Sequence, residues 1–225
     1  DNGDLLAIAS KVVATAEKRL KRLNLIKPSE KAKRMAQEYD LEPSFVEIVL
    51  HESDLIYGGV SKALLTLKNN VLTVNAGVDH KNAPNGYVAL WPKNPQKSAQ
   101  KIRKEIIERT GKNVGVLIVD SMVSPLRMGT KGVSLGMAGF EPVRDYRGNK
   151  DLFGNSIFIT RHAVADDIAS AAHLLMGESN EQTPIVLVKN APVKLCEKVD
   201  PKSTVIPTEQ CLFGKLLQKS MAKSH

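Results

Sequence analysis

Two aspartates stand where the sequence predicts that strands end. An apolar segment beginning at Leu72 leads to Asp79, and another beginning at Val114 leads to Asp120. Each is followed by groups that can also bind a metal ion or a phosphate: His80, Lys81 and Asn82 after the first, Ser121 after the second. Such ligands suit Mg²⁺ or Mn²⁺, which bind through one or two carboxylates while phosphate oxygens supply the rest. Because open sheets bind ligands at strand ends, the pair predicts a divalent-metal site; the alternative is that each aspartate caps a turn.

A glycine-rich segment after Asp120 carries cations that could hold an anion. Its glycines are interleaved with five basic residues: Arg127, Lys131, Arg144, Arg147 and Lys150. Glycine lets backbone N–H groups approach an anion closely, and arginine can bind a phosphate through two parallel hydrogen bonds. Neither a P-loop nor a dinucleotide-binding fingerprint is present. The segment is compatible with a phosphate site, and the polar loop 177–184 is equally compatible with a ligand loop or an ordinary connection.

The remaining reactive side chains form no recognisable catalytic set. His51, His162 and His173 stand apart from one another, and we expect them to pack or to lie on the surface. Asp166 and Asp167 fall in the first turn of a predicted helix, where negative charge interacts favourably with the helix dipole. No Ser/His/Asp or Cys/His combination can be assembled, so catalysis by such a set finds no support.

The bulk composition is that of a globular protein with excess positive charge. Its 225 residues, 42% hydrophobic, suffice for one large domain or two closely joined ones. The net charge of +8 suits nucleotides and polyanionic cofactors, whereas 4% aromatic residues give little support to base stacking, so no nucleic-acid partner is expected. No apolar run reaches the roughly 18 residues that cross a bilayer, so no membrane partner is expected. Cys196 and Cys211 are too few for a disulfide framework, which predicts a cytoplasmic protein.

Periodicity predicts the elements that must position these residues. Helices are expected at residues 28–39, with Pro28 in the first turn, after Pro43, at 98–110 and at 163–176, the last with Val164, Ile168, Ala172 and Leu175 inward. Strands are expected at residues 5–9, 63–67, 71–76, 87–91, 114–119, 157–160 and 185–188, with a tight hairpin turn at Asn69-Asn70. This mixture predicts an α+β protein with mixed sheets and flanking helices. It forms one unit over residues 1–225, or two closely joined subdomains, 1–112 and 113–225.

Motifs along most of the chain carry a resemblance to a known family. They are Gly3-Asp4-Leu5-Leu6, Ser10-Lys11-Val12-Val13, Asn75-Ala76-Gly77-Val78-Asp79 with Asn82, Asp120-Ser121, Arg127-x-Gly129, Gly136-x-x-Gly139 and Val164-Ala165-Asp166-Asp167-Ile168-Ala169. In order and spacing over roughly residues 3 to 190, the sequence resembles the coenzyme F420-0:L-glutamate ligase (gamma-glutamyl ligase) family.

The resemblance implies a gamma-glutamyl ligase-like fold and a GTP-dependent ligase that joins L-glutamate to F420-0. It further implies an intertwined homodimer that uses Mg²⁺ or Mn²⁺, with a monovalent cation as an additional option. The family pattern places Asp79, Asp120, Ser121 and Glu178 at the metal, and Asp79, Asp120 and Arg127 in catalysis. Ser10, Lys11 and Asn82 would contact the nucleotide, as would the loop residues Gly177, Glu178, Ser179, Asn180, Glu181, Gln182, Thr183 and Pro184.

Several positions depart from the family pattern, among them Asp167, which stands where the family has a glutamate. Thr15 stands where a lysine is common, and Val123-Ser124 stand where a glycine–arginine pair is common. Two alternatives therefore stand beside the leading prediction. One is a ligase that serves a different phosphorylated acceptor, and the other is a non-catalytic protein that binds a nucleotide or a deazaflavin.

Overall fold

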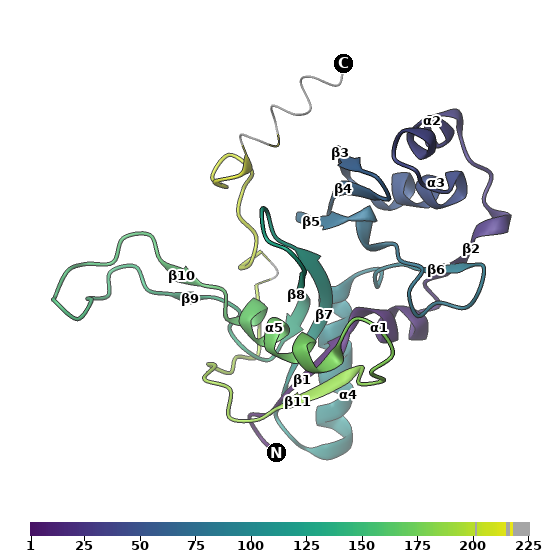
Figure 1. Ribbon diagram of the computed structural model, residues 1–225. Coiled ribbons are helices and arrows are strands. Elements are labelled where there is room, and N and C mark those ends of the chain that lie inside the picture. The colour runs from purple at the N-terminus through teal and green to yellow at the C-terminus, as the bar shows by residue number, and fades with distance from the viewer. Residues whose placement is uncertain (201, 215–216, 218–225) are drawn as a thin grey trace. The chain divides into compact units, whose positions relative to one another are not determined.

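The computed structural model describes residues 1–200, 202–214 and 217 (Figure 1). The chain divides into two compact units. The first unit combines residues Asp1–Val13 with Pro92–Thr204, and the second combines Ala14–Trp91 with the described residues from Val205 onward. The boundary expected between residues 112 and 113 falls inside the first unit. The second unit is thus mainly an insertion into the chain of the first.

A four-stranded mixed sheet forms the centre of the first unit, in the order β11-β1-β7-β8. These strands are β1 (Leu5–Ala9), β7 (Gly115–Val123), β8 (Thr130–Ala138) and β11 (Ile185–Val188). β1 is parallel to β7, whereas β11 pairs with β1 and β8 pairs with β7 in antiparallel fashion. The prediction of a mixed sheet is confirmed.

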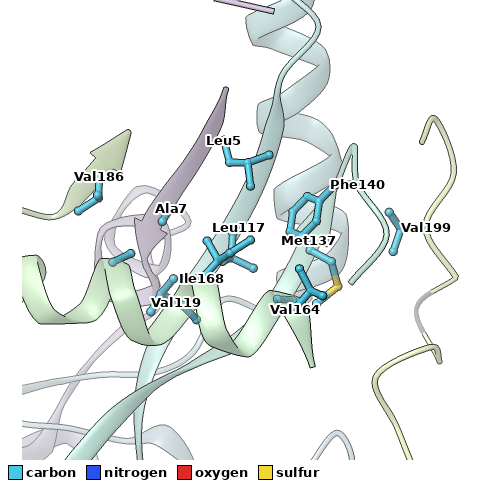
Figure 2. Close-up of a cluster of buried hydrophobic side chains, with 13 residues drawn as sticks. Leu5, Ala7, Leu117, Val119, Met137, Phe140, Val164, Ile168, Val186 and Val199 are labelled. Carbon is cyan, nitrogen blue, oxygen red and sulfur yellow. The ribbon is translucent and has the colours of Figure 1, made fainter. Parts of the chain in front are cut away.

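Helices α4 (Pro95–Thr110) and α5 (Val164–Met176) pack on opposite faces of this sheet. Leu117 and Val119 of β7 lie in one core cluster with α5, whereas Val116 and Ile118 lie in another with Ala99 of α4. Figure 2 shows the cluster on the α5 side. This division follows from the alternation of side chains along a strand.

The structure corrects the packing face predicted for α5. Leu175 was expected inward, but it is 61% exposed. Ala165 and Ala169 are buried instead, together with Val164, Ile168 and Ala172. Small side chains are needed on this face because α5 approaches the backbone of β8 closely at Gly132.

The first part of the glycine-rich segment that was considered as an anion site forms strand β8, with Gly132 and Gly136 inside the strand. A Cβ added at Gly132 would lie 2.6 Å from the carbonyl carbon of Ala169 in α5, and one at Gly136 would lie 2.6 Å from the Gln96 nitrogen in α4. A register shift between Ile118 and Val119 of β7 separates the two glycines, so that they face different helices. They allow two helices to approach one strand, a use of glycine that the sequence alone does not distinguish from anion binding.

A long arm extends from the first unit between β9 (Arg144–Asp145) and β10 (Arg161–His162) (Figure 1). The strand predicted at residues 157–160 is wrong, because pairing occurs at Arg161 and His162 instead. Two of the predicted anion-binding cations serve the arm itself. Arg147 forms a salt bridge with Asp145 at 2.5 Å, and Lys150 Nζ donates to Ser156 Oγ at 2.9 Å.

The second unit combines a helical pair with short sheets. Its elements are α2 (Glu30–Glu38), α3 (Pro43–Glu52), the meander β3 (Leu55–Val60), β4 (Ala63–Lys68) and β5 (Val71–Val74), the pair β2 (Leu20–Arg22) and β6 (Tyr87–Ala89), and the short 3₁₀ turns η1 (Leu23–Leu25) and η2 (Asn75–Gly77). Helix α1 (Ser10–Ala16) spans the division between the units. The hairpin predicted at Asn69-Asn70 is confirmed, with φ of 51° and 62°. β3 was missed, since Gly58 and Gly59 interrupt its apolar pattern.

Two further properties concern the environment of the chain. No helix in the described part of the chain is both long and apolar enough to cross a membrane. Cys196 and Cys211 are both free thiols. The cytoplasmic location stays a prediction.

Candidate active site

The carboxyl ends of the parallel strands β1 and β7 in the first unit bring several of the predicted ligand residues together. The parallel pair β1 and β7 sets Ala9 opposite Val119, so the residues that follow, Ser10 and Asp120, are level with each other. The Ala9 N–H donates to the carbonyl oxygen of Pro184 at 2.9 Å, which brings the end of loop 177–184 to the same end of the sheet. Ligands bind at the carboxyl ends of parallel strands in open sheets. Residues distant in the sequence therefore share one candidate site.

Asp120 lies within its strand and does not end it. β7 continues to Val123 because Asp120 pairs with Val133 and Ser121 pairs with Gly132 of β8. Residues 115–119 are buried, whereas Asp120 and Ser121 are half-buried. The prediction that Asp120 ends a strand is thus wrong. The buried part of β7 does end there, because the residues from Asp120 onward are at least partly exposed. The ladder with β8 fixes the backbone that carries both side chains.

Glu178 contacts two side chains that sequence reasoning did not connect with it. Thr130 Oγ1 donates to Glu178 Oε1 at 2.5 Å, and His173 Nε2 lies 3.1 Å from the same oxygen. His173 was expected to stand apart, and this contact corrects that expectation. Gly177 ends α5 at a φ of 70° and turns the chain, so Glu178 returns to the last turn of the helix. In the sequence, a glycine that can end a helix stands directly before Glu178 and four residues after His173. This pattern could have predicted the contact between the histidine and the glutamate.

Glu181 organises the rest of the loop. Its carboxylate accepts the Ser179 N–H at 2.8 Å and lies against Gly177, where an added Cβ would be 2.5 Å from a carboxylate oxygen. The N–H groups of Glu181 itself and of Ser179 lower the pKa of this carboxyl. Converging backbone N–H groups are also what binds phosphate oxygens. In the loop, the N–H groups of Ser179 and Glu181 bind this carboxylate, and a role of the loop in phosphate binding stays a prediction.

Arg127 lies at the exposed tip between β7 and β8. Its N–H donates to the Ser124 carbonyl oxygen at 3.2 Å, which closes the turn. A catalytic role for its guanidinium stays a prediction.

Asp79 and Asn82 lie in the second unit, beyond the end of β5. That strand ends at Val74, and a left-handed turn, η2, follows with φ of 52°, 53° and 69°. The prediction that Asp79 ends a strand is therefore wrong. Asp79 instead pairs with Ala89 of β6, its N–H donating at 3.0 Å and its carbonyl accepting at 2.9 Å.

The donor groups of the predicted metal site suit a hard divalent cation. Asp79, Asp120 and Ser121 supply carboxylate and hydroxyl oxygens. The Asp79 carboxylate is oriented by the Lys81 N–H, which donates to it at 2.9 Å. Because Asp79 and Asp120 belong to different units, a joint site stays a prediction. Among residues 1–200, 202–214 and 217, no three His, Cys, Asp or Glu side chains gather in a metal-binding arrangement.

Comparison with known proteins decides the family. The family model described as "F420-0:Gamma-glutamyl ligase" matches residues 1–190. The chain belongs to this family. The match includes every candidate residue named above, from Ser10 to Pro184.

Relatives of this chain are similar over most of their length. A protein of Methanococcus maripaludis strain C7 is 42% identical over 191 residues, which cover 84% of this chain and 77% of the relative. A protein of Methanopyrus kandleri is 40% identical, covering 84% and 75%, and one of Archaeoglobus fulgidus is 39% identical, covering 84% and 76%. All three are named "Coenzyme F420:L-glutamate ligase". The chain is accordingly an enzyme of the ligase class.

Proposed function

We propose that this gamma-glutamyl ligase forms an amide between L-glutamate and coenzyme F420-0 and uses GTP as its energy source. The names of relatives that are 39–42% identical, which print coenzyme F420 and L-glutamate, support these two substrates, and the family description prints F420-0. The structural observation that carries the proposal is the end of the first unit's sheet where Ser10, Asp120 and loop 177–184 meet. A nucleotide-driven ligase needs such a place for phosphates beside carboxylates.

The proposed reaction has two balanced steps. An oxygen of the F420-0 carboxylate attacks the terminal phosphorus of GTP, and GDP leaves with the electrons of the broken P–O bond. The amino group of glutamate then attacks the acyl phosphate carbon, inorganic phosphate leaves, and the nitrogen loses a proton. Backbone N–H groups of loop 177–184 and the Lys11 ammonium would stabilise charge on the phosphates.

Asp79, Asp120, Ser121 and Glu178 would hold a Mg²⁺ or Mn²⁺ ion in this proposal. When bound, the ion supplies positive charge that neutralises the phosphate oxygens. The hydroxyl of Ser121 and the carboxylates are all oxygen donors, which these ions prefer. Asn82 of the second unit would bind the nucleotide. Exchange of K⁺ for Na⁺ in the activity assay tests whether a monovalent cation also takes part.

We also propose that the ligase is a homodimer in which the arm between β9 and β10 contacts a second copy. Four apolar side chains on the arm are 79–98% exposed: Leu152, Phe153, Phe158 and Ile159. Exposed apolar patches of this kind mark interaction sites. Sedimentation equilibrium is expected to give a dimer for the natural protein and a monomer for the Phe153→Asp/Phe158→Asp variant. A monomeric natural protein would refute the dimer.

One assay tests the ligase reaction. The protein is incubated with GTP, Mn²⁺, L-glutamate and F420-0, and mass spectrometry follows GDP and glutamylated F420. Product is expected with the natural protein and is lost with Asp120→Ala or EDTA, whereas the surface control Asp40→Ala retains it. GTP hydrolysis without glutamylated product would indicate another acceptor, and tight binding without turnover would indicate a non-catalytic binding protein.

A further inference from the structure

The backbone that leads to Asp79 is held in an unfavourable conformation. Asn75, Ala76 and Gly77 all have positive φ, at 52°, 53° and 69°. Asparagine and glycine tolerate this region, but Ala76 does not favour it, and Ala76 is also completely buried. Such backbone persists only where its surroundings hold it, and it clusters at functional sites. The groups that hold this turn therefore bear on the position of Asp79.

Alternate residues of β4 hold the turn. The Leu64 N–H donates to Asn75 Oδ1 at 2.8 Å, and the Ala76 N–H donates to Thr66 Oγ1 at 2.8 Å. Lys68 Nζ donates to the Ala76 carbonyl oxygen at 3.2 Å. Residues 64, 66 and 68 share one face of the strand, so β4 presents a leucine, a threonine and a lysine to the core. The two polar side chains are both directed at Ala76.

Lys68 is an unusual residue at such a position, because its side chain is only 7% exposed. Its ammonium lies 2.6 Å from a Glu52 oxygen and 5.3 Å from the centre of the Trp91 ring. Arg19 binds both oxygens of Glu52, at 2.8 and 2.9 Å. Burial lowers the pKa of Lys68 against the opposing effect of Glu52. Buried ion pairs contribute little net stability compared with apolar packing, so stability alone is a weak reason for this lysine.

We infer that Lys68 is a positioning residue that fixes the Ala76 carbonyl and thereby places Asp79 for its ligand, while Glu52 and Arg19 hold the ammonium in place. This inference rests on the proposed function, in which Asp79 binds the divalent metal. Lys68 is not one of the residues proposed to bind the metal or the nucleotide. Because it bonds to the backbone three residues before Asp79, its loss frees the turn without removing any metal-binding group.

The test compares Lys68→Met with Val46→Ala in the full chain. Methionine keeps the volume of lysine but cannot donate to Ala76, and Glu52 remains paired with Arg19. Val46 is a fully buried residue of α3 in the same core cluster as Ala76, so Val46→Ala weakens the apolar packing around the turn while its hydrogen bonds to β4 stay in place. Hydrogen exchange in metal-free protein reports the Ala76, Val78 and Asp79 amides, and an electron paramagnetic resonance titration reports Mn²⁺ binding.

In Lys68→Met we expect these amides to exchange about tenfold faster or more. Mn²⁺ should bind about 10–100-fold more weakly, the effect of removing a group that orients a metal ligand. Val46→Ala should change both quantities by less than about threefold. If Lys68→Met does not fold, Thr66→Val removes the second bond to Ala76 and is expected to produce the same two effects.

Two results separate this inference from the proposed function. If Asp79→Ala abolishes Mn²⁺ binding while Lys68→Met binds like the natural protein, the positioning role is refuted and the metal site stands. If Asp79→Ala binds Mn²⁺ like the natural protein, the proposed metal site fails, and with it the part of the inference that concerns metal. Unchanged exchange at Ala76 in Lys68→Met would overturn the inference without reference to any ligand.

Discussion

Replacing Gly132 by alanine is expected to force α5 away from β8. The new Cβ would lie 2.6 Å from the Ala169 carbonyl carbon and 2.7 Å from His173 Cβ. Carbon atoms prefer separations of about 3.5–4.0 Å, so the helix must retreat by roughly 1 Å. Overpacking of this kind costs about 1–3 kcal/mol. The retreat also weakens the bond from Ser170 Oγ to the Gly132 carbonyl oxygen, at 2.9 Å, which contributes about 0.5–1.5 kcal/mol.

The expected loss is therefore about 2–4 kcal/mol of unfolding free energy. For a chain of this size each kcal/mol lowers the thermal midpoint by about 2–4 °C, so the midpoint should fall by about 5–15 °C. Urea unfolding followed by circular dichroism gives the free energy, and calorimetry gives the midpoint. Activity should fall as well, because His173, which contacts Glu178, moves with the helix.

Gly111→Ala is the matched control for this experiment. Gly111 ends α4 at a φ of 66°, and no atom lies within 4 Å of a Cβ added there. This variant therefore carries only the cost of a left-handed alanine, about 1 kcal/mol. If Gly132→Ala proves no less stable than Gly111→Ala, the close backbone approach of α5 to β8 is refuted.

Three further predictions concern stability. Arg103→Met should lower the unfolding free energy in urea by about 2–3 kcal/mol, because the buried guanidinium donates to the Val114 carbonyl oxygen at 2.9 Å; an unchanged value would show that bond to be dispensable. Burial alone would raise the pKa of Glu52, but its ion pairs with Lys68 and Arg19 outweigh burial and lower the pKa below the ordinary value of 4.5. The ionised Glu52 therefore stabilises the folded protein fully above pH 4.5, and this contribution is lost as the pH falls through the lower pKa of the folded state. Glu52→Gln should flatten this acid dependence of the thermal midpoint, and a parallel curve would contradict the assignment. Asn70→Val should cost about 1–2 kcal/mol at a φ of 62°, whereas Asn70→Gly should be tolerated, as urea unfolding of the two variants will show.

Local physical chemistry was sufficient to predict several elements of the second unit. The predicted helix after residue 28 is present as α2, although Pro28 precedes its first turn and Ser29 caps it by accepting the Ala32 N–H. Pro43 begins α3, as helix-start preferences predict. Asn69-Asn70 forms the predicted hairpin turn because asparagine tolerates the positive φ that such a turn requires. Each of these features depends on neighbours in the sequence.

Features that depend on distant partners were not predicted. The glycines of β8 become strand residues only because β7 extends to pair with them and two helices approach them. On β4 the leucines at 65 and 67 suggest the inward face, yet Thr66 and Lys68 are buried, because the turn before Asp79 needs polar partners. The sequence pattern singled out Asp79, Asp120 and Ser121, the family resemblance assigned the roles of the site residues, and the contact of Thr130 with Glu178 needed the fold.

The order of strands in the first unit has a consequence for synthesis of the chain. β1 is made before both of its partner strands, since Leu5 pairs with Gly115 on one side and with Val188 on the other. The inserted segment Ala14–Trp91 has its own core and a meander of consecutive strands, so its contacts form earlier. Until β11 has been synthesised, β1 has an unpaired edge, and such edges can pair with other chains. The period of greatest aggregation risk therefore lasts until nearly the whole family-matched region has left the ribosome.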